Sequence, residues 1–134
     1  MHRYFKLLID FRKNHPSLRR TKFQVEEIDD KPAMSWHGFR MNRPDWSEKS
    51  KSLAVQYLAN QETGDCDMYL LFNADALGHS FALPKLTSGK TWHRVLNTAC
   101  DSPEDMVEPG SEISINPQRS YRLAPYSVAV LIGK

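Results

Sequence analysis

The sequence contains little cysteine, no long apolar run and only a small excess of positive charge. Its two cysteines, Cys66 and Cys100, are far apart and fit no zinc-binding or redox spacing. We expect both to be reduced thiols, as is usual inside cells, with a disulfide between them as the alternative. No apolar run approaches the roughly 20 residues that a membrane-spanning helix needs, so we expect no membrane partner.

The charge pattern argues against a nucleic-acid-binding protein. The net charge is only +2, and the densest basic stretch, residues 12–22, is followed directly by four acids, Glu26, Glu27, Asp29 and Asp30. A nucleic-acid-binding domain usually concentrates its basic residues on one face. We therefore expect no nucleic-acid partner.

Motifs that bind metals, cofactors or phosphates are also missing. The five histidines show no helical pair spacing and join no cysteine cluster, and the six glycines are scattered as turn residues. The nucleophile elbow of serine hydrolases is absent, and we expect no cofactor and no metal. The N-terminus carries polar residues inside its apolar stretch, unlike a signal peptide. This predicts a cytoplasmic location, or a plastid if the source is a plant.

What the sequence does contain is typical of one globular domain with an amphipathic helix in front. The 134 residues, 40% hydrophobic and 25% charged, can bury roughly two-thirds of their unfolded surface. One helical face is formed by apolar residues at i, i+3, i+4 and i+7: Tyr4, Leu7, Leu8 and Phe11. Pro16 predicts that this helix ends near residue 14 or 15. Because the helix follows Met1 without a capping residue, we interpret residues 1–22 as the last helix of a preceding domain plus a connector.

After Pro16 the sequence changes to short apolar runs separated by turn residues. The predicted strands are 34–39, 53–58, 68–72, 80–83, 91–96 and 127–132, with weaker signals at 23–28, 113–115 and 121–123. The run 68–72 is the most apolar, which favours a central strand buried on both faces. Strands at this spacing, without long helices between them, predict an antiparallel β-sandwich domain over residues 23–134.

Acidic side chains are the first group that could carry chemistry. Pairs occur at Glu26/Glu27, Asp29/Asp30 and Glu104/Asp105, and glycoside hydrolysis needs two carboxylates. We favour their interpretation as solvated loop charge, because acidic side chains are mostly exposed. We therefore name no catalytic residue.

Aromatic side chains are the second group, since Trp and Tyr combine a flat apolar body with a polar tip that suits a sugar ring. Tyr57, Tyr69 and Trp92 fall inside predicted strands and are expected in the core. Trp36 and Trp46 flank an irregular segment. We predict that both bind substrate, with packing against a neighbouring domain as the equal alternative.

Several short motifs run in order along nearly the whole chain. They begin with Arg-x-x-His-Pro-x-Leu-Arg at 12–19, and Trp-His-Gly at 36–38 precedes Pro-Asp-Trp at 44–46. Further pieces follow at 52–54, 71–74, 81–84, 92–98, 101–105 and 126–131. In this order they resemble isoamylase-type glycogen and starch debranching enzymes of the α-amylase superfamily, glycoside hydrolase family 13. The first motif is similar to the end of their catalytic barrel, and the next two to the segment that leads into their C-terminal domain.

The resemblance implies an antiparallel β-sandwich behind a (β/α)₈ barrel. Residues 1–22 would then be the last helix of this truncated catalytic barrel plus a connector. The catalytic carboxylates of the family lie upstream and match no residue here. The first hypothesis is a non-catalytic C-terminal domain that stabilises the barrel of an enzyme hydrolysing α-1,6 branch linkages, with that missing barrel as its partner. The second is an α-glucan-binding module that uses surface aromatics. The third, a hydrolase acting through the acidic pairs, is disfavoured because the domain shows no cleft-forming barrel loops.

Overall fold

The computed structural model describes residues 2–18, 27–28, 31–32, 34–41, 43–59, 66–86 and 89–134. Helix α1 (His2–Asn14) and the short 3₁₀ helix η1 (Pro16–Leu18) come first. The strands that follow are β1 (Glu27–Ile28), β2 (Lys31–Pro32), β3 (Met34–His37), β4 (Ser52–Tyr57), β5 (Asp67–Asn73), β6 (His79–Ala82), β7 (Trp92–Asn97), β8 (Ile113–Ser114), β9 (Ser120–Leu123) and β10 (Ser127–Gly133). The fold is mostly antiparallel β with one N-terminal helix, as predicted.

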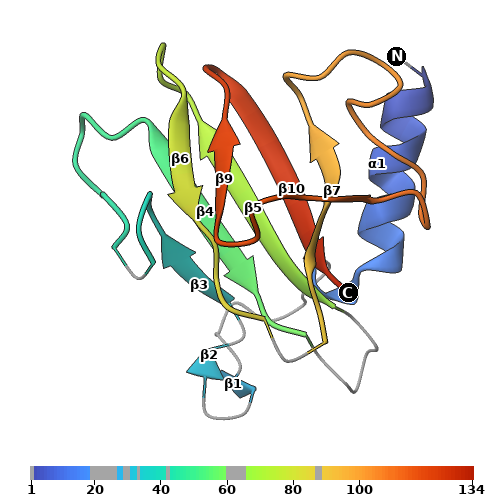
Figure 1. Cartoon of the computed structure of the whole chain (residues 1–134), viewed down its shortest axis with the longest axis horizontal. Coiled ribbons are helices and arrows are strands. Elements are labelled where there is room, and N and C mark those ends of the chain that lie inside the picture. Colours follow the sequence, from blue (N-terminus) through green and yellow to red (C-terminus); the bar gives the residue numbers. More distant parts are fainter. Residues whose placement is uncertain are drawn as a thin grey trace.

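Six strands form one antiparallel sheet in the order β3-β4-β5-β10-β7-β8. Its two central strands, β5 and β10, pair along their whole length, from Ser127 opposite Asn73 to Gly133 opposite Asp67. Strands β6 and β9 form a separate two-stranded ribbon that overlies the middle of the sheet in Figure 1. The sheet is thus enclosed between a β-ribbon and a helix, which gives a sandwich-like domain.

Successive residues of β5 and β10 point to opposite faces of the sheet and build two separate cores. In β10, Ala129 and Leu131 point toward the ribbon, whereas Val130 and Ile132 point toward the helix. The ribbon-side core consists of Ala54, Tyr69, Leu71, Phe81, Leu83, Trp92, Leu123, Ala129 and Leu131. The helix-side core consists of Leu7, Met68, Val95, Leu96, Met106, Val130 and Ile132. The apolar run at 68–72 is therefore a central strand with an apolar layer on each side.

An irregularity in β7 adapts this strand to the helix. Leu96 is opposite Val130 and Arg94 is opposite Leu131, so Val95 is an extra residue without a partner of its own in β10. Val95 and Leu96 both belong to the helix-side core, where each is 4% exposed. Strict alternation would send one of two neighbours to the other face. The bulge therefore lets β7 offer two consecutive apolar side chains to α1.

Helix α1 packs on the sheet through one apolar stripe. Leu7 is buried in the helix-side core, and three further apolar side chains pack against it, namely Tyr4, Leu8 and Phe11. The last turn carries Arg12 and Lys13, where positive charge interacts favourably with the helix dipole. The helix ends at Asn14 because Pro16 disfavours helical geometry in the residue before it.

The first turn of α1 is tied to the loop that follows β7. The Arg3 guanidinium donates hydrogen bonds to the Met106 carbonyl at 2.8 Å and to the Ser102 hydroxyl at 3.1 Å, and it pairs with the Asp105 carboxylate. The carbonyl of Asp105 in turn accepts a hydrogen bond from the Asn97 amide at 2.9 Å. These contacts fix the rotation of the helix about its axis, and so decide what its other faces meet.

The sequence-based predictions are confirmed for the fold class and for most elements. The predicted helix corresponds to α1, and the six stronger strands correspond to β3, β4, β5, β6, β7 and β10. Most of the predicted strand 23–28 and the predicted domain boundary between residues 22 and 23 lie outside the described residues. Within the described ranges, no helix has the length and apolar character that crossing a membrane requires. Cys66 and Cys100 carry thiols and share no disulfide.

Truncation of Leu7 tests the packing of α1 on the sheet. We expect Leu7→Ala to lower the free energy of unfolding by about 2–4 kcal/mol, because it leaves a cavity in the helix-side core. Ile9 lies on the same helix but is 55% exposed, so Ile9→Ala is the matched control and should change stability by less than about 0.5 kcal/mol. Urea unfolding followed by circular dichroism measures both. Equal losses for the two variants would contradict this orientation of the helix.

Candidate functional site

The two tryptophans predicted as binding residues lie side by side. Trp36 is on the edge strand β3 and is 42% exposed, and Trp46 lies in the connection to β4 and is 65% exposed. Their ring centroids are 5.6 Å apart at an interplanar angle of 72°, an edge-to-face arrangement that aromatic pairs favour. The structure therefore brings both predicted residues together at the surface and leaves both accessible.

Between Trp36 and Trp46 the chain turns back on itself, and its backbone passes close to Gly38. After β3 the chain turns, and the Arg43 amide donates a hydrogen bond to the Arg40 carbonyl at 3.4 Å. The carbonyl oxygen of Arg43 then passes so near to Gly38 that a Cβ at position 38 would lie 2.5 Å from it. Only glycine fits such an approach without a shift of the backbone, which explains the glycine of the Trp-His-Gly motif.

The Pro-Asp-Trp motif sets the exposure of Trp46 through a local turn. The Asp45 carboxylate accepts a hydrogen bond from the Ser47 amide at 3.0 Å, a contact typical of aspartate in turns. This backbone hydrogen bond, together with one from the Ser47 side chain, lowers the pKa of the Asp45 carboxyl. Trp46 lies between the two bonded residues and projects outward from the turn.

Trp36 points to the same face of the sheet as helix α1. It is opposite Val55 on β4, Val55 is opposite Leu70 on β5, and Leu70 is opposite Val130 of the helix-side core. Paired residues of antiparallel strands project to the same face. On this face Val55 is buried, whereas Leu53, Leu70 and Phe72 are half-buried, and Leu70 packs against the helix-side core.

Helix α1 carries two exposed apolar residues outside the stripe that packs on the sheet. Phe5 and Ile9 are 56% and 55% exposed and lie one turn apart on the same side of the helix. Phe5 follows Arg3 by two residues, or about 200° around the helix axis, so it points away from the loop that Arg3 contacts. We call Phe5, Ile9, Trp36 and Trp46 the apolar face.

His37 adjoins Trp36 but points into the ribbon-side core, and it is only 1% exposed. Its Nε2 atom lies 2.7 Å from the Ser35 hydroxyl, and its ring centroid is 5.8 Å from that of Tyr69. Burial lowers the pKa of His37, and a hydrogen bond with the Gln56 side chain offsets part of this effect. The imidazole therefore anchors the edge strand and is not accessible to a ligand.

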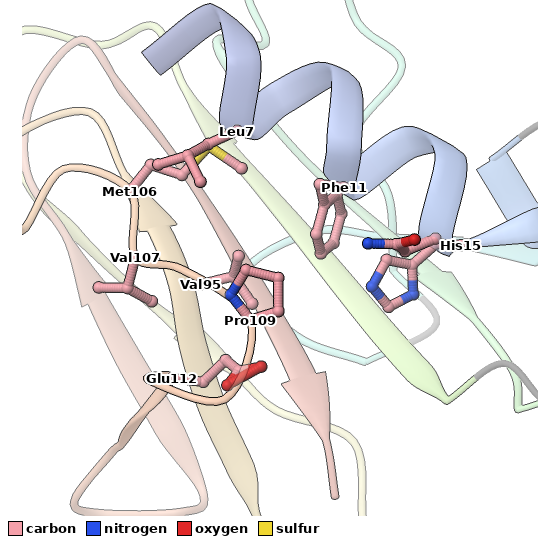
Figure 2. A pocket seen from close by; sticks show the side chains of 9 residues that line it. Leu7, Phe11, His15, Val95, Met106, Val107, Pro109 and Glu112 are labelled. Atoms are coloured by element: carbon pink, nitrogen blue, oxygen red, sulfur yellow. The ribbon is translucent and has the colours of Figure 1, made fainter. Parts of the chain in front are cut away.

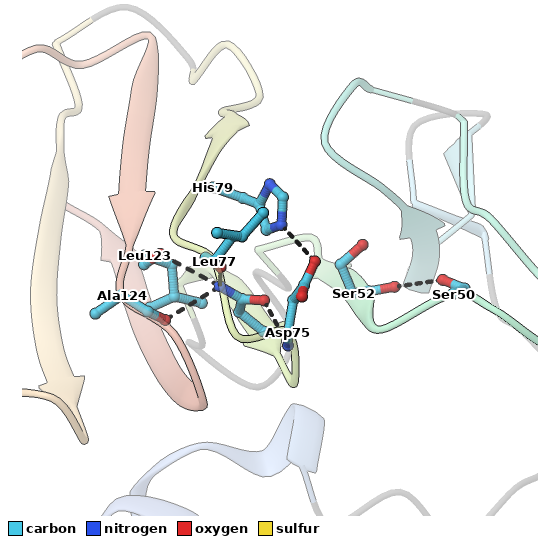
Figure 3. A network of polar contacts seen from close by, with 8 residues as sticks. Ser50, Ser52, Asp75, Leu77, His79, Leu123 and Ala124 are labelled. Atoms are coloured by element: carbon cyan, nitrogen blue, oxygen red, sulfur yellow. Dashed lines mark hydrogen bonds and ion pairs between the residues drawn. The ribbon is translucent and has the colours of Figure 1, made fainter.

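A polar network joins β5 to the loops at one end of the sheet (Figure 3). The Asn73 side-chain amide donates hydrogen bonds to the carbonyls of Leu77 at 3.0 Å and Ala124 at 3.1 Å, and its oxygen accepts one from the Asp75 amide at 3.0 Å. His79 Nε2 lies 2.9 Å from the Asp75 carboxylate, and this hydrogen bond lowers the pKa of the Asp75 carboxyl. The network holds the turn between β5 and β6 against β9, which is a structural role.

A narrow apolar pocket lies between α1 and the loop before β8 (Figure 2). Its volume is about 60 Å³, well below the roughly 300–1,000 Å³ of small-molecule sites. Most of its lining belongs to the contact between the helix and the sheet, including Leu7, Phe11, Val95 and Met106. We therefore interpret it as a packing gap under the helix and not as a site for a sugar chain.

Of the predicted acidic pairs, only Glu104/Asp105 has both members within the described residues. Asp105 pairs with Arg3, and its neighbour Glu104 is exposed. Glu26 and the pair Asp29/Asp30 lie outside the described residues. In the part of the chain that the structure describes, no group of three or more His, Cys, Asp or Glu side chains is arranged to hold a metal ion.

Sequence reasoning did not identify Phe5 and Ile9 as site residues. It found the stripe that packs on the sheet, but two further apolar residues at i and i+4 widen the apolar surface of the helix. A helix with apolar residues on two sides is typical of one that packs between two layers. This signal was present in the sequence, although only the structure shows which side is covered.

Comparison with known proteins gives consistent matches over this chain. A sequence model of the family described as "Isoamylase 1-3, C-terminal" matches residues 35–131. The chain is 32% identical over 132 residues to "Isoamylase 3, chloroplastic" from Oryza sativa subsp. japonica, which covers 98% of the chain and 15% of that protein. It is 32% identical over 110 residues to "Isoamylase SU1, chloroplastic" from Zea mays, covering 82% and 13%. An "Isoamylase" from Flavobacterium sp is 30% identical over 144 residues, covering 98% and 18%. The chain spans less than a fifth of the length of these relatives.

The pH dependence of stability tests the burial of His37. Its pKa in the folded chain is lowered from 6.5, so the unfolded chain binds more protons once the pH falls below that value. We expect the stability contributed by neutral His37 to be complete above about pH 6.5 and to decline as the pH falls through its folded-state pKa. Urea unfolding at several pH values between about 7 and 5 measures this.

The matched variants for this experiment are His37→Gln and His93→Gln, since His93 is half-exposed on β7. The first should flatten the pH dependence, and the second should keep that of the unmodified chain. An unchanged pH dependence in His37→Gln would show that another group is responsible.

Proposed function

Because this chain belongs to the family of isoamylase C-terminal domains, we propose that it is the non-catalytic C-terminal domain of a hydrolase that cleaves α-1,6 branch linkages in glycogen-like or starch-like glucan. Its role is to stabilise the catalytic (β/α)₈ barrel of the same polypeptide. The relatives that it matches are named isoamylases and are more than five times its length. Their length leaves room for a catalytic region in the parent protein.

The apolar face is the observation that carries this proposal. Phe5, Ile9, Trp36 and Trp46 are between 42% and 65% exposed, and Trp36 lies on the face of the sheet against which α1 packs. The half-buried residues Leu53, Leu70 and Phe72 lie on the same face. Large apolar side chains that a domain leaves exposed can mark an interaction surface. The barrel of the parent is the partner that we assign to it.

The magnitude of this contact would matter for stability. Burying the exposed halves of Phe5 and Ile9 contributes on the order of 2 kcal/mol, and the two tryptophans offer more surface than these. A typical domain is stable by only about 5–15 kcal/mol in total. Helix α1 would then lie between its own sheet and the barrel, with Leu7 facing one layer and Phe5 the other.

Substitution of Phe5 and Ile9 tests this assignment, because they should matter only when the barrel is present. In the isolated chain, the double variant F5Q/I9Q should stay within about 0.5 kcal/mol of the original stability, since glutamine is a good helix former and both sites are exposed. In the full-length parent it should shorten the half-life of debranching activity on heating by several-fold. Leu7→Ala is the control that lowers stability in both contexts.

Two results would contradict the proposal. One is a reading frame upstream of the Met1 codon that encodes no barrel. The other is a full-length F5Q/I9Q parent that withstands heating as well as the unmodified parent does, which would show that the apolar face is not covered by the catalytic region.

A second candidate function is supported by the aromatic pair alone. Trp36 and Trp46 are adjacent and accessible, and tryptophan surfaces of this kind can stack against the faces of glucose units. The chain would then act as an α-glucan-binding module. The two functions make opposite demands on the pair, since a barrel contact buries it and a glucan site leaves it open.

Titration of the isolated chain with maltoheptaose separates these functions. If the pair binds glucan, tryptophan fluorescence should change in a saturable way and Trp46→Ala should abolish the change. Tyr126→Ala is the matched control, because Tyr126 is 72% exposed but lies at the turn before β10. The absence of a saturable change up to millimolar ligand would leave the barrel contact as the role of the pair.

A further inference from the structure

A second hollow lies on the ribbon side of the sheet, on the face opposite the apolar face. It is formed where the connection from β6 to β7 meets the connection from β8 to β9, and its volume is about 230 Å³. Its apolar lining includes Pro84, Leu86 and Trp92, of which Trp92 is only 1% exposed and belongs to the ribbon-side core. The volume approaches the lower end of the roughly 300–1,000 Å³ range of small-molecule sites.

The framework of this pocket is held in place by hydrogen bonds that are buried or partly buried. The Trp92 indole Nε1 donates to the Pro84 carbonyl at 2.9 Å. The Gln118 side chain accepts a hydrogen bond from the Trp92 amide at 2.6 Å and donates to the carbonyls of Trp92 at 3.1 Å and Ile115 at 2.7 Å. The two connections are therefore locked together, and a ligand would meet a preformed surface.

Among the described residues that line the pocket, the charged ones are all cationic. They are Lys85, Lys90 and Arg119, and all three are exposed. None of the three forms an ion pair with another described residue. The carboxylate of Glu112, on the neighbouring stretch before β8, is already paired with the Lys134 ammonium at 3.1 Å. The pocket therefore carries a local positive charge although the chain as a whole is nearly neutral.

We propose that this pocket binds a phosphate ester of a sugar. Arginine presents a planar fork that matches phosphate oxygens, and lysine ammonium groups supply further point charges around it. A bare anion would leave the apolar surface of the half-buried Leu86 unused, whereas the C–H face of a sugar ring can lie against it. The ester can come from a free sugar phosphate or from a phosphorylated glucose unit within a polysaccharide. The proposal does not depend on the debranching function, because the pocket lies on the other face of the sheet.

Calorimetric titration of the chain with glucose 6-phosphate tests the site, with glucose and inorganic phosphate as reference ligands. We expect glucose 6-phosphate to bind more tightly than either reference ligand, and binding to weaken between about 20 and about 200 mM salt. The variant Arg119→Gln should weaken it by about tenfold. This change leaves intact the Arg119 carbonyl, which accepts a hydrogen bond from the Leu83 amide at 2.9 Å. Lys51→Gln is the matched control, because Lys51 is an exposed lysine before β4, outside the pocket.

The outcomes separate the proposal from its alternatives. Absence of saturable binding overturns it, as does equal weakening by Arg119→Gln and Lys51→Gln, which would indicate non-specific attraction of anions. Glucose or inorganic phosphate binding as tightly as glucose 6-phosphate would overturn the assignment of the ligand. Co-sedimentation with a phosphorylated glucan, before and after phosphatase treatment, distinguishes the two sources. Co-sedimentation that is lost after phosphatase treatment supports the polysaccharide as the source. Saturable binding of glucose 6-phosphate without co-sedimentation of the phosphorylated glucan supports the free ester.

Discussion

The structure depends on burying both faces of strands β5 and β10. These two strands carry large apolar side chains on alternate faces, so a single covering layer would leave half of them in water. The β6–β9 ribbon covers one face and helix α1 covers part of the other. Among the described residues, Trp36 on β3 and the outer side of the helix still expose apolar side chains, and these form part of the apolar face.

The sequence predicted this architecture where the pattern is local. The run 68–72 is apolar at every position, which indicates burial on both faces, and the Tyr4–Phe11 stripe has the helical period. It could not predict which layer covers which face, because strand order arises from contacts between distant segments. The bulge at Val95 has no sequence signal of this kind, since Val95-Leu96 is as compatible with strict alternation in a buried strand as with a bulge.

The sequence predicted only part of the candidate site, for a similar reason. Trp36 and Trp46 were selected because they flank an irregular segment, and their contact depends on the return of the chain past Gly38. Phe5 and Ile9 were missed because a helical stripe shows where one layer packs but not whether a second layer exists. The cationic pocket was missed because Lys85 and Arg119 come from connections more than thirty residues apart. Residues that meet only through tertiary structure leave no spacing in the sequence to recognise.

The motifs that resemble the isoamylase family have a common physical role in the structure. Gly38 permits a close backbone approach, Asn73 joins three segments through its side-chain amide, and Asp105 holds the first turn of the helix through Arg3. Each is a joint between elements. A signature built from such joints reports how the domain is assembled and how it presents its apolar face. We infer that its functional content lies in the surface that these joints orient, and this is why we propose attachment to a larger protein as the role of the domain.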